Sequence, residues 1–564
     1  MILYSCSNPR YLYDIHSLLK SFFPAEEVKD VVVYQKEVEK KNNKIRYNDK
    51  NKTSNNITDN IKYTVDVSFD EAARTVKIDI YSGEKLILSD RSEYTLSDIN
   101  SEKDASTNGS RESFTTPKNI LKTLLYKLLV KLSGRTLPWG SLTGIRPTKI
   151  AYNMLEKSND EKEIKNYLKN IYNVSDKKAD LSIEIAGLER SILEAFDYKS
   201  GYSLYMGIPF CPTRCGYCSF AAYPLASFKN IVDDYLDCLE KELSACSRIM
   251  KDVRLDTIYI GGGTPTTLSA AQSDRLLCFI EKIFDLSHVK EFTVEAGRPD
   301  SILDDRDKLR VLRAHGVDRI CVNPQTFKQE TLDAIGRGHT VEETERAYFW
   351  AREMGFDNIN MDIILGLPGE GVRDVEHTAD ELCRLKPDDL TVHSLSLKRG
   401  SAMQAKISEE LAAKKYRAGL KYLNEFNIGK GAEETGSYEY VLEDESSEML
   451  DIIEAAARSM KLRPYYLYRQ KNISGNMENT GYAREGAYGL SNMLGMEEVH
   501  SVVACGAGAV TKCVSQCAQN KGLISRTGNA KDILSYMKGI DEIIKRKEEL
   551  FLQEVKGIQI QLYK

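Results

Sequence analysis

Three cysteines within eight residues constrain this chain more than any other feature of its sequence. Cys211, Cys215 and Cys218 have the spacing Cys-x3-Cys-x2-Cys in the run Tyr-Met-Gly-Ile-Pro-Phe-Cys-Pro-Thr-Arg-Cys-Gly-Tyr-Cys-Ser-Phe. Pro212 and Gly216 lie between them, and two such residues favour a loop over an unbroken helix. A loop with three thiolates can wrap a compact metal centre, and ligation by thiolates alone favours zinc or an iron–sulfur cluster.

The number of ligands bears on which metal centre this is. A closed zinc site needs four ligands, and so does an ordinary electron-transfer cluster. The run supplies three. A zinc knuckle would therefore need a distant fourth ligand, whereas a [4Fe–4S] cluster would keep one iron open for a substrate or cofactor. Both interpretations stay open on the cysteines alone.

Composition limits the class of protein that carries this loop. The chain has 564 residues, of which 42% are hydrophobic and 29% charged, and its net charge is −5. These values are typical of a globular protein, and at about 150 residues per domain the length predicts three or four domains. There is no global basic footprint for nucleic acid, no secretory signal and no apolar run of about 20 residues. We therefore expect a cytoplasmic protein with reduced thiols and neither a nucleic-acid nor a membrane partner.

A regular alternation of strands and helices begins near residue 203. Six short apolar strands are predicted, at about 203–207, 256–260, 291–295, 318–322, 358–365 and 389–395. Segments with a helical pattern separate them, and parallel strands need such crossover helices. Six units rather than eight predict a partial barrel. Active-site residues should gather at the carboxyl ends of its strands, and the cysteine loop follows the first strand.

Glycine and polar residues follow or end the later strands. The second strand leads into Gly261-Gly-Gly-Thr-Pro265, where glycines let the backbone approach a ligand and expose N–H groups, although a tight turn explains them equally well. The run lacks the Gly-Lys-Ser/Thr of a nucleoside triphosphate loop. Glu295 ends the third strand, Gln325 follows the fourth, and Asp362 lies within the fifth. Their side chains offer hydrogen-bond acceptors and donors for a polar ligand.

Taken in order, these residues resemble a known family. The cysteine run after Tyr-x-Gly-Ile-Pro-Phe is similar to the cluster motif of the radical S-adenosylmethionine (SAM) enzymes. Within them it most resembles the oxygen-independent coproporphyrinogen III oxidase (dehydrogenase) group and its haem-chaperone relatives. The resemblance covers roughly residues 203–510. It implies a [4Fe–4S] cluster on Cys211, Cys215 and Cys218, with SAM on the open iron as the source of a 5′-deoxyadenosyl radical.

The resemblance also implies the residues that contact SAM. They are Tyr205, Tyr217, Gly262, Gly263, Thr264, Glu295, Gln325, Arg337, Asp362 and Ser396. The glycine run is implied to meet the methionyl amino group, and Arg337 to pair with the SAM carboxylate. The two tyrosines match aromatic positions beside the cluster, and Ser396 matches loosely the contact after the last strand. A reductant such as flavodoxin or ferredoxin would be a partner.

The activity implied by the resemblance is conversion of coproporphyrinogen III to protoporphyrinogen IX by loss of two carboxyl groups, a step of haem biosynthesis. Well-known oxidases of the group carry another Cys two residues after the third cluster Cys, where this chain has Phe220, as in the haem-chaperone branch. The long N-terminal region and residues 464–482 resemble instead a coproporphyrinogen dehydrogenase-like branch. A haem chaperone, with His393 or His500 as a haem ligand, and a radical SAM tetrapyrrole methyltransferase are the alternatives.

Three regions are predicted for this α/β protein. Residues 1–200 form an accessory α+β region with flexible polar insertions, residues 201–400 a partial (β/α)6 radical SAM barrel, and residues 401–564 a mostly helical domain that covers the substrate. Within the first region the pattern predicts, in order, a strand at 31–34, a flexible excursion at 36–61, an antiparallel sheet over 62–92, a loop at 98–116 and helices at 120–132 and over 151–197.

An aromatic and basic segment stands out in the C-terminal region. Tyr465, Tyr466, Tyr468, Arg469 and Lys471 offer flat apolar faces and cations, which a tetrapyrrole with propionates would need. An exposed amphipathic strand explains the segment equally well.

Two further C-terminal patterns are weaker indications of function. Cys505, Cys513 and Cys517 are spaced too irregularly to predict a second cluster, and the small-residue run 503–510 resembles a family glycine motif but suits close packing as well.

Overall fold

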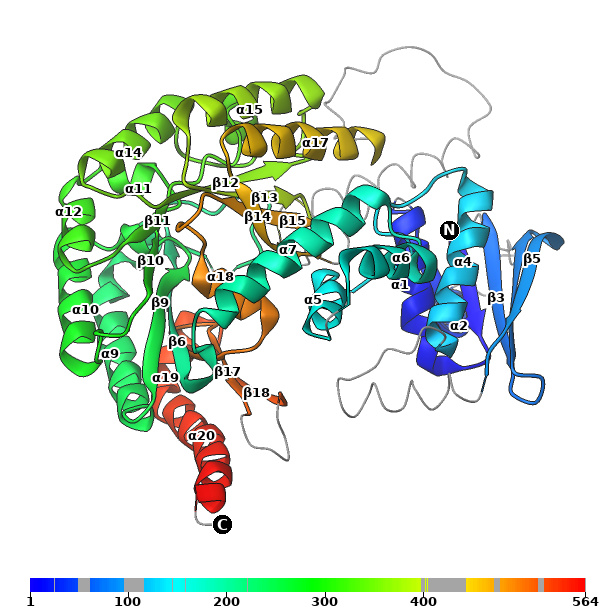
Figure 1. Ribbon diagram of the computed structural model, residues 1–564, viewed down its shortest axis with the longest axis horizontal. Helices are drawn as coiled ribbons and strands as arrows, with labels where there is room; N and C mark the ends of the chain where they lie inside the picture. The colour runs from blue at the N-terminus through cyan, green and yellow to red at the C-terminus, as the bar shows by residue number, and fades with distance from the viewer. Residues whose placement is uncertain are drawn as a thin grey trace. The chain divides into compact units, whose positions relative to one another are not determined.

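The computed structural model describes most of the chain, as residues 1–24, 26–48, 61–95, 116–144, 146–157, 159–220, 222–396, 401, 403, 443–470, 477–515 and 522–562. The chain divides into two compact units (Figure 1). One comprises Met1–Ala186 with Arg469–Met477, and the other comprises Gly187–Tyr468 with Glu478–Lys564. Arg469–Met477 thus belongs to the smaller unit, although the chain on either side of it belongs to the larger one.

The smaller unit is built on one five-stranded sheet in the order β2-β1-β3-β4-β5. Its strands are β1 (Ile2–Cys6), β2 (Val28–Asp30), β3 (Tyr63–Asp70), β4 (Thr75–Ser82) and β5 (Lys85–Glu93). β1 runs parallel to β2 and β3, and β3, β4 and β5 are antiparallel. The helices are α1 (Leu12–Phe22), α2 (Val31–Asn48), α4 (Pro117–Ser133), α5 (Thr148–Glu156), α6 (Glu161–Tyr172) and α7 (Asp176–Glu194), the last of which continues into the larger unit. Apolar side chains from the sheet, α1 and α4 form its core.

The structure confirms some of the predictions for the N-terminal region and contradicts others. The antiparallel sheet over 62–92 and the later helices are confirmed. The strand at 31–34 is wrong, because these residues begin α2: the Asp30 carboxylate accepts hydrogen bonds from the N–H groups of Val32 (2.8 Å) and Val33 (3.2 Å) and starts the helix there. Residues 36–48 of the predicted excursion are helical. Residues 49–60, and nearly all of the predicted loop at 98–116, lie outside the described residues.

Six parallel strands form the centre of the larger unit. They are β6 (Gly201–Ile208), β9 (Arg254–Gly262), β10 (Glu291–Glu295), β11 (Arg319–Cys321), β12 (Ile359–Leu365) and β13 (Asp389–Ser394). They stand in that order, every neighbouring pair is parallel, and each lies within two residues of its predicted ends. Nearly all their side chains are buried, as in a sheet covered on both faces. The sheet does not close on itself, so the predicted partial (β/α)6 barrel is confirmed.

Helices cover the outer face of these strands (Figure 1). The longer ones are α9 (Val232–Ile249), α10 (Ala270–Ile283), α12 (Asp307–Ala314), α14 (Val341–Glu353) and α15 (Val372–Leu385). Shorter elements in the connections are β7 (Phe210–Cys211), β8 (Tyr223–Pro224), α8 (Leu225–Phe228), α11 (Asp300–Leu303) and α13 (Gln329–Ala334). The short elements mostly follow the carboxyl ends of strands, where the candidate site lies.

The C-terminal region extends the sheet at both edges. Its helices are α17 (Glu443–Ser459), α18 (Leu490–Glu497), α19 (Ile533–Lys538) and α20 (Ile540–Leu562). Between them lie five strands: β14 (Arg463–Tyr468), β15 (Asn479–Ala483), β16 (Ser501–Cys505), β17 (Val510–Val514) and β18 (Ile524–Gly528). The sequence pattern indicates only β14, as one of two interpretations of the aromatic segment. β15 pairs with β13 and β16 with β6, so both edges of the barrel are covered.

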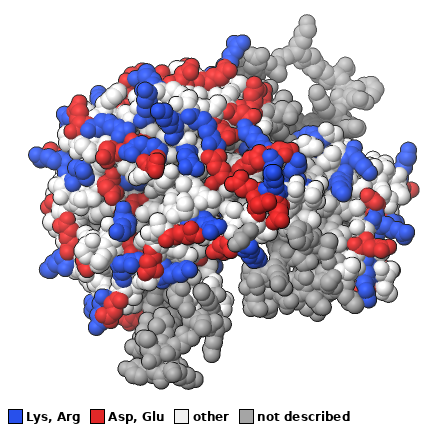
Figure 2. Space-filling view, in the orientation of Figure 1, with Lys and Arg blue, Asp and Glu red and all other residues white. Residues whose placement is uncertain are grey.

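Two further observations concern the distribution of surface charge and the apolar character of the helices. On the face shown in Figure 2, positive and negative side chains are intermingled rather than segregated by sign. Within the described parts of the chain, we find no helix with the length and apolar character needed to cross a bilayer.

A buried carboxylate holds the C-terminal helices on the barrel. Glu242 of α9 is completely buried and accepts hydrogen bonds from Lys547 Nζ (2.6 Å), Tyr536 Oη (2.7 Å), Asn529 Nδ2 (2.8 Å) and the Gly506 N–H (2.8 Å). These four groups come from α20, α19, the segment after β18 and the segment after β16. A buried charge needs this many partners, because it has lost its water.

Replacing Lys547 with methionine tests this network. We expect Lys547→Met to lower the free energy of unfolding by about 3–5 kcal/mol, because Glu242 would keep its burial and lose its cation. The midpoint of urea unfolding measures the change. Lys545→Met on the same helix is the matched control, since Lys545 is exposed, and should change stability by no more than about 0.5 kcal/mol. Equal effects of the two substitutions would contradict the role given to Glu242.

Candidate functional site

The cysteine loop lies at the carboxyl end of β6, as predicted. Cys211 ends the short strand β7, which pairs with β8. The N–H of Gly216 donates to the carbonyl of Ile335 (2.8 Å), and the Gly216 carbonyl accepts from the N–H of Met403 (2.9 Å). Cys211 and Cys215 are buried and Cys218 is half-buried. The loop is thus anchored through its backbone, and its three sulfurs are largely shielded from water.

Hydrogen-bond donors surround the thiol groups. Arg298 Nη1 lies 3.6 Å and Arg337 Nη1 3.7 Å from Cys215 Sγ, and Thr264 Oγ1 lies 3.5 Å from Cys211 Sγ. Burial raises the pKa of the Cys211 thiol to about 11, and the charges of Cys215 and Cys218 add to the rise. Bound metal removes such protons, because a coordinating thiol is deprotonated. Three thiolates backed by two cationic side chains suit a cluster with three protein ligands.

The glycine run packs against the cysteine loop. The N–H groups of Gly263 and Thr264 donate to the carbonyls of Ile208 (2.8 Å) and Phe210 (2.7 Å). A Cβ on Gly263 would lie 2.5 Å from the Phe210 carbonyl oxygen and 3.0 Å from Cys211 Sγ. Sequence reasoning expected glycine N–H groups exposed toward a ligand, but these two N–H groups hold the loops together. The run therefore sets the position of Cys211.

Glu295 stands at the carboxyl end of β10 among aromatic side chains. Tyr259 Oη donates to Glu295 Oε1 (2.6 Å), and the Tyr259 ring stacks on Tyr205 with the ring centres 6.0 Å apart. A Cβ on Gly261 would lie 3.0 Å from the Glu295 carboxyl group, so this glycine makes room for it. Burial raises the pKa of Glu295 to about 7. This carboxyl group changes charge near neutral pH.

Asp362 lies at the centre of a second polar group. Its Oδ1 accepts a hydrogen bond from Asn360 Nδ2 (2.7 Å) and its Oδ2 accepts one from Asn323 Nδ2 (2.8 Å). His393 Nε2 lies 3.8 Å from the same Oδ2. Burial acts to raise the pKa of Asp362, but the interactions with His393 and Asn360 outweigh it and hold the pKa below its usual value. Gln325, in the left-handed region with φ +68°, donates its N–H to the Asp362 carbonyl (2.9 Å).

Arg337 links the cysteine loop to the strand ends. Its Nη2 donates to the carbonyls of Gly297 (2.8 Å) and Asn323 (2.7 Å), while Nη1 faces Cys215. Its Nε is buried and has no hydrogen-bond partner within the described residues. A buried N–H without a partner is costly, so an anionic ligand group would fit at this point.

The structure brings together most of the predicted site residues. Direct contacts join Cys211 to Gly263 and Thr264, and Cys215 to Arg337. The other predicted residues lie at the same end of the sheet in smaller groups. Glu295 lies with Gly261 and the Tyr205–Tyr259 pair, and Gln325 with Asp362. Gly262 ends β9, Ser396 lies two residues beyond β13, and Tyr217 packs against Ile335, Ile364, Leu367 and Met403.

Sequence reasoning missed Arg298, Asn323 and Tyr259. Arg298 contacts Cys215 and pairs with Asp300 (2.7 Å), Asn323 contacts Asp362, and Tyr259 contacts Glu295. Arg298 and Asn323 stand within three residues after a predicted strand, and that position was the available signal. Tyr259 lies inside a strand, where nothing distinguished it from an ordinary core residue.

The C-terminal tyrosines do not form an open aromatic surface. Tyr465 and Tyr466 are buried in β14, where Tyr465 Oη donates to Asp389 Oδ2 (2.9 Å) and Tyr466 Oη lies 3.4 Å from Thr391 Oγ1. The strand is confirmed, but its predicted exposure is wrong for these two side chains. They pack against residues of β13 and are not open to contact a tetrapyrrole. Arg469 belongs to the smaller unit and donates to the Leu142 carbonyl (2.6 Å). Lys471 lies outside the described residues.

The remaining candidates have structural partners. His500 is buried between Ser203 Oγ (3.0 Å) and Asp256 Oδ2 (3.2 Å), which disfavours a haem-ligand role. In the small-residue run, a Cβ on Gly506 would lie 2.4 Å from the Gly207 carbonyl, so this glycine serves close packing. Cys505 and Cys513 are buried in separate strands, β16 and β17, and Cys517 lies outside the described residues.

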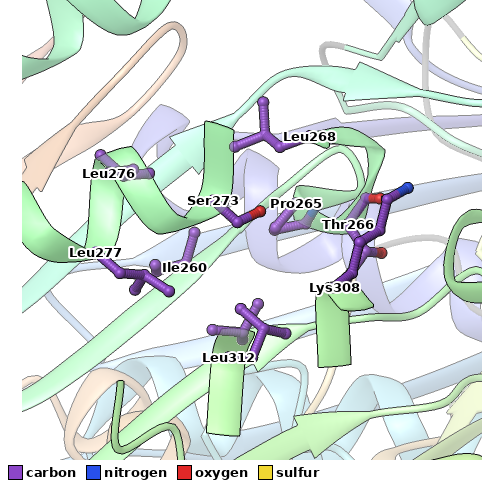
Figure 3. Close-up of a pocket in the computed structure, with 10 residues that line it drawn as sticks. Ile260, Pro265, Thr266, Leu268, Ser273, Leu276, Leu277, Lys308 and Leu312 are labelled. Carbon is purple, nitrogen blue, oxygen red and sulfur yellow. The ribbon is translucent and has the colours of Figure 1, made fainter. Parts of the chain in front are cut away.

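A small cavity lies next to Pro265 and Thr266, which follow the glycine run (Figure 3). Its volume is about 20 Å³, and side chains of β9, α10 and α12 line it, among them Ile260, Leu276, Leu277 and Leu312. A space of this size holds about one water molecule. It is a packing defect under α10, and the candidate site at the strand ends is separate from it.

Comparison with known proteins agrees with this geometry. The family model of the radical SAM superfamily matches residues 205–382. The oxygen-independent coproporphyrinogen-III oxidase-like protein HemZ of Bacillus subtilis is 38% identical over 454 residues, which cover 79% of this chain and 84% of that protein. The chain belongs to the oxygen-independent coproporphyrinogen III oxidase-like family of radical SAM proteins. The cofactors of this superfamily are a [4Fe–4S] cluster and SAM, as predicted.

Shorter matches point to two branches of the family. The heme chaperone HemW of Bacillus subtilis is 38% identical over 194 residues, which cover 34% of this chain and 50% of that protein. The oxygen-independent coproporphyrinogen III oxidase of Salmonella typhimurium is 32% identical over 190 residues, which cover 34% of this chain and 41% of that protein. Because both matches are partial, they do not distinguish the two activities.

Gly263→Ala tests the packing of the glycine run on the cysteine loop. The new Cβ would push against the Phe210 carbonyl and Cys211 Sγ, so we expect a loss of about 1–3 kcal/mol in stability and substoichiometric iron after anaerobic reconstitution. Iron and sulfide analysis with the cluster absorbance measures the second effect. Gly216→Ala is the control in the same loop, since its Cβ would meet its nearest neighbour at an ordinary 3.6 Å. Full iron loading of Gly263→Ala would refute this account.

Proposed function

We propose that this protein is an oxygen-independent coproporphyrinogen III dehydrogenase, which converts two propionate side chains to vinyl groups and yields protoporphyrinogen IX. The observation that carries the proposal is the match to HemZ, which extends over most of both chains and far beyond the barrel. When bound, the reduced cluster supplies the electron that cleaves SAM to a 5′-deoxyadenosyl radical. A flavodoxin or ferredoxin is the proposed class of electron donor.

The cysteine loop and its two arginines have the first role in this proposal. Cys211, Cys215 and Cys218 would hold the cluster, and Arg298 and Arg337 would donate hydrogen bonds to the Cys215 thiolate. Such donors outside the ligand set orient the ligands and adjust the reduction potential of a cluster. The backbone hydrogen bonds of Gly216 would hold the loop in place around the cluster.

The strand ends have the second role, the binding of SAM. Arg337 would use its unpartnered Nε toward the SAM carboxylate, and the carboxylate of Glu295 would accept hydrogen bonds from hydroxyl or ammonium groups. Because two N–H groups of the glycine run are engaged, its part toward the amino group would be taken by carbonyl oxygens, which accept hydrogen bonds. The remaining proposed contacts are Tyr205, Tyr217, Gln325, Asp362 and Ser396.

The aromatic side chains around the site would protect the reaction. Tyr205 and Tyr259 stack beside Glu295, and Tyr217, within the cysteine loop, packs among apolar side chains. In this proposal the rings would exclude water from the region between the loop and the strand ends. Water exclusion strengthens the electrostatic interactions within a site and prevents side reactions of a reactive intermediate.

A haem chaperone is the second candidate, and two observations favour it. HemW of Bacillus subtilis is 38% identical to this chain over 194 residues. Phe220, which stands where well-known oxidases carry a further Cys, is 65% exposed next to the cysteine loop. An exposed aromatic ring at this position suits contact with a flat macrocycle. In that function the protein would hold haem without decarboxylating it.

An anaerobic assay distinguishes these functions. The reconstituted protein is given SAM, a reductant, an electron acceptor and coproporphyrinogen III, and the tetrapyrroles are analysed by mass spectrometry. We expect loss of two carboxyl groups, and no product from the Cys211→Ala, Cys215→Ala and Cys218→Ala variants. A tetrapyrrole that keeps four propionates would refute the dehydrogenase. Haem that copurifies would then support the chaperone, and a methylated product would indicate a methyltransferase.

The pKa of Glu295 predicts how SAM binding depends on pH. Its carboxyl group becomes ionised as the pH rises through about 7, and the ionised form accepts hydrogen bonds more strongly. SAM affinity should therefore increase about five- to tenfold from about pH 6 to about pH 8. Equilibrium dialysis on the cluster-loaded protein measures it.

The same measurement on two variants identifies the group responsible. Glu295→Gln should bind SAM more weakly with a flat pH profile, whereas Glu330→Gln, at an exposed position on α13, should behave like the wild type. Parallel pH profiles for Glu295→Gln and the wild type would contradict the assignment.

A further inference from the structure

Four side chains with metal-binding groups meet on the outer wall of the barrel. α10 contributes Asp274, Cys278 and Glu281, whose spacing of four and three residues places them on one face of the helix. His315 follows the end of α12. Its Nε2 lies 3.0 Å from Asp274 Oδ1 and 4.0 Å from Cys278 Sγ, and its Nδ1 lies 2.8 Å from Glu281 Oε1. The candidate active site uses none of these residues.

Three of the donor atoms already surround a common point. One atom each from Asp274, Cys278 and His315 lie within 4.8 Å of one another. Ligands of a tetrahedral zinc ion lie about 2.0–2.3 Å from the metal, which places them roughly 3.3–3.8 Å apart. Small rotations of two exposed side chains on α10 would therefore complete the geometry. Sulfur, nitrogen and oxygen together suit a zinc-like divalent ion, whereas calcium and magnesium take oxygen alone.

Glu281 gives the cluster a feature that a chance group of polar residues lacks. Its carboxylate faces Nδ1 of His315, while Nε2 faces Asp274 and Cys278. With a metal ion bound at Nε2, the remaining imidazole proton would lie on Nδ1 and be donated to Glu281. Histidine ligands of metals almost always donate their other N–H to a carboxylate, a carbonyl or water. The apolar packing beneath also fixes the two helices: Leu276 and Leu277 of α10 lie opposite Leu312 of α12 (Figure 3).

We propose that Asp274, Cys278 and His315 bind a divalent transition-metal ion of the zinc class, oriented by Glu281, and that this ion links α10 to the turn before β11. Three protein ligands leave the fourth position to water. α12 leads into the amino end of β11, so the site lies at the opposite end of the strands from the cysteine loop. The ion therefore stabilises the barrel wall and takes no part in the radical reaction.

Cobalt is the probe for this site. The full-length protein, with its cluster reconstituted anaerobically, is titrated with Co²⁺. We expect one equivalent to bind with a thiolate-to-cobalt charge-transfer band in the difference spectrum. Cys278→Ser should lose the band. Cys238→Ser, which changes a half-buried cysteine of α9, should keep it and is the matched control.

Two further variants test the other ligands. His315→Gln should abolish the stoichiometric binding, and Glu281→Gln should weaken it about 10- to 100-fold. Zn²⁺ should raise the melting temperature of the wild type and leave that of Cys278→Ser unchanged, because only a folded protein with the site gains from binding.

A different result would overturn the proposal. If wild type and Cys278→Ser bind Co²⁺ alike, the thiol takes no part, and His315 is simply a histidine between two carboxylates. Melting of Cys278→Ser in the presence of a chelator should match the wild type, which shows that the substitution leaves the fold intact.

Discussion

The two guanidinium groups beside Cys215 are the interaction on which the site depends. Arg298 and Arg337 are buried at the carboxyl ends of the strands, where a cation without compensation would be costly. Asp300 pairs with Arg298, and the carbonyls of Gly297 and Asn323 accept from Arg337. The remaining positive field falls on the cysteine loop. A loop of three thiolates is therefore stabilised here, and the strand ends that hold the arginines also hold the polar residues around it.

Much of this arrangement was predictable because its signals are local. Six apolar strands and the spacing of Cys211, Cys215 and Cys218 can be recognised within a few residues each, and the carboxyl-end rule then places Glu295 and Gln325 near the loop. Interactions across long stretches of sequence had no such signal. Glu242 and Lys547 are 305 residues apart, and neither residue alone indicates that the other will neutralise it.

Local propensity also led to errors that tertiary or capping interactions explain. Residues 31–34 are β-branched or aromatic and predict a strand, yet the Asp30 carboxylate satisfies the first N–H groups of a helix. Tyr465 and Tyr466 suggested an aromatic surface, but Asp389 and Thr391 provide buried partners for their hydroxyl groups. The aromatic composition of a segment thus predicted the strand correctly and its exposure wrongly, because exposure depends on the neighbouring strand.

The pairing of β16 with β6 has a consequence for how the protein is made. β6 leads into the cysteine loop, and its neighbour on one side, β16, lies about 300 residues later in the chain. During synthesis the amino-terminal part emerges first, so the three thiols leave the ribosome long before the strand that covers the edge beside them exists. Until β16, which lies in the last eighth of the chain, is made, the loop stays next to an open sheet edge. Pairing with β16 then protects this edge of the sheet from pairing with another chain.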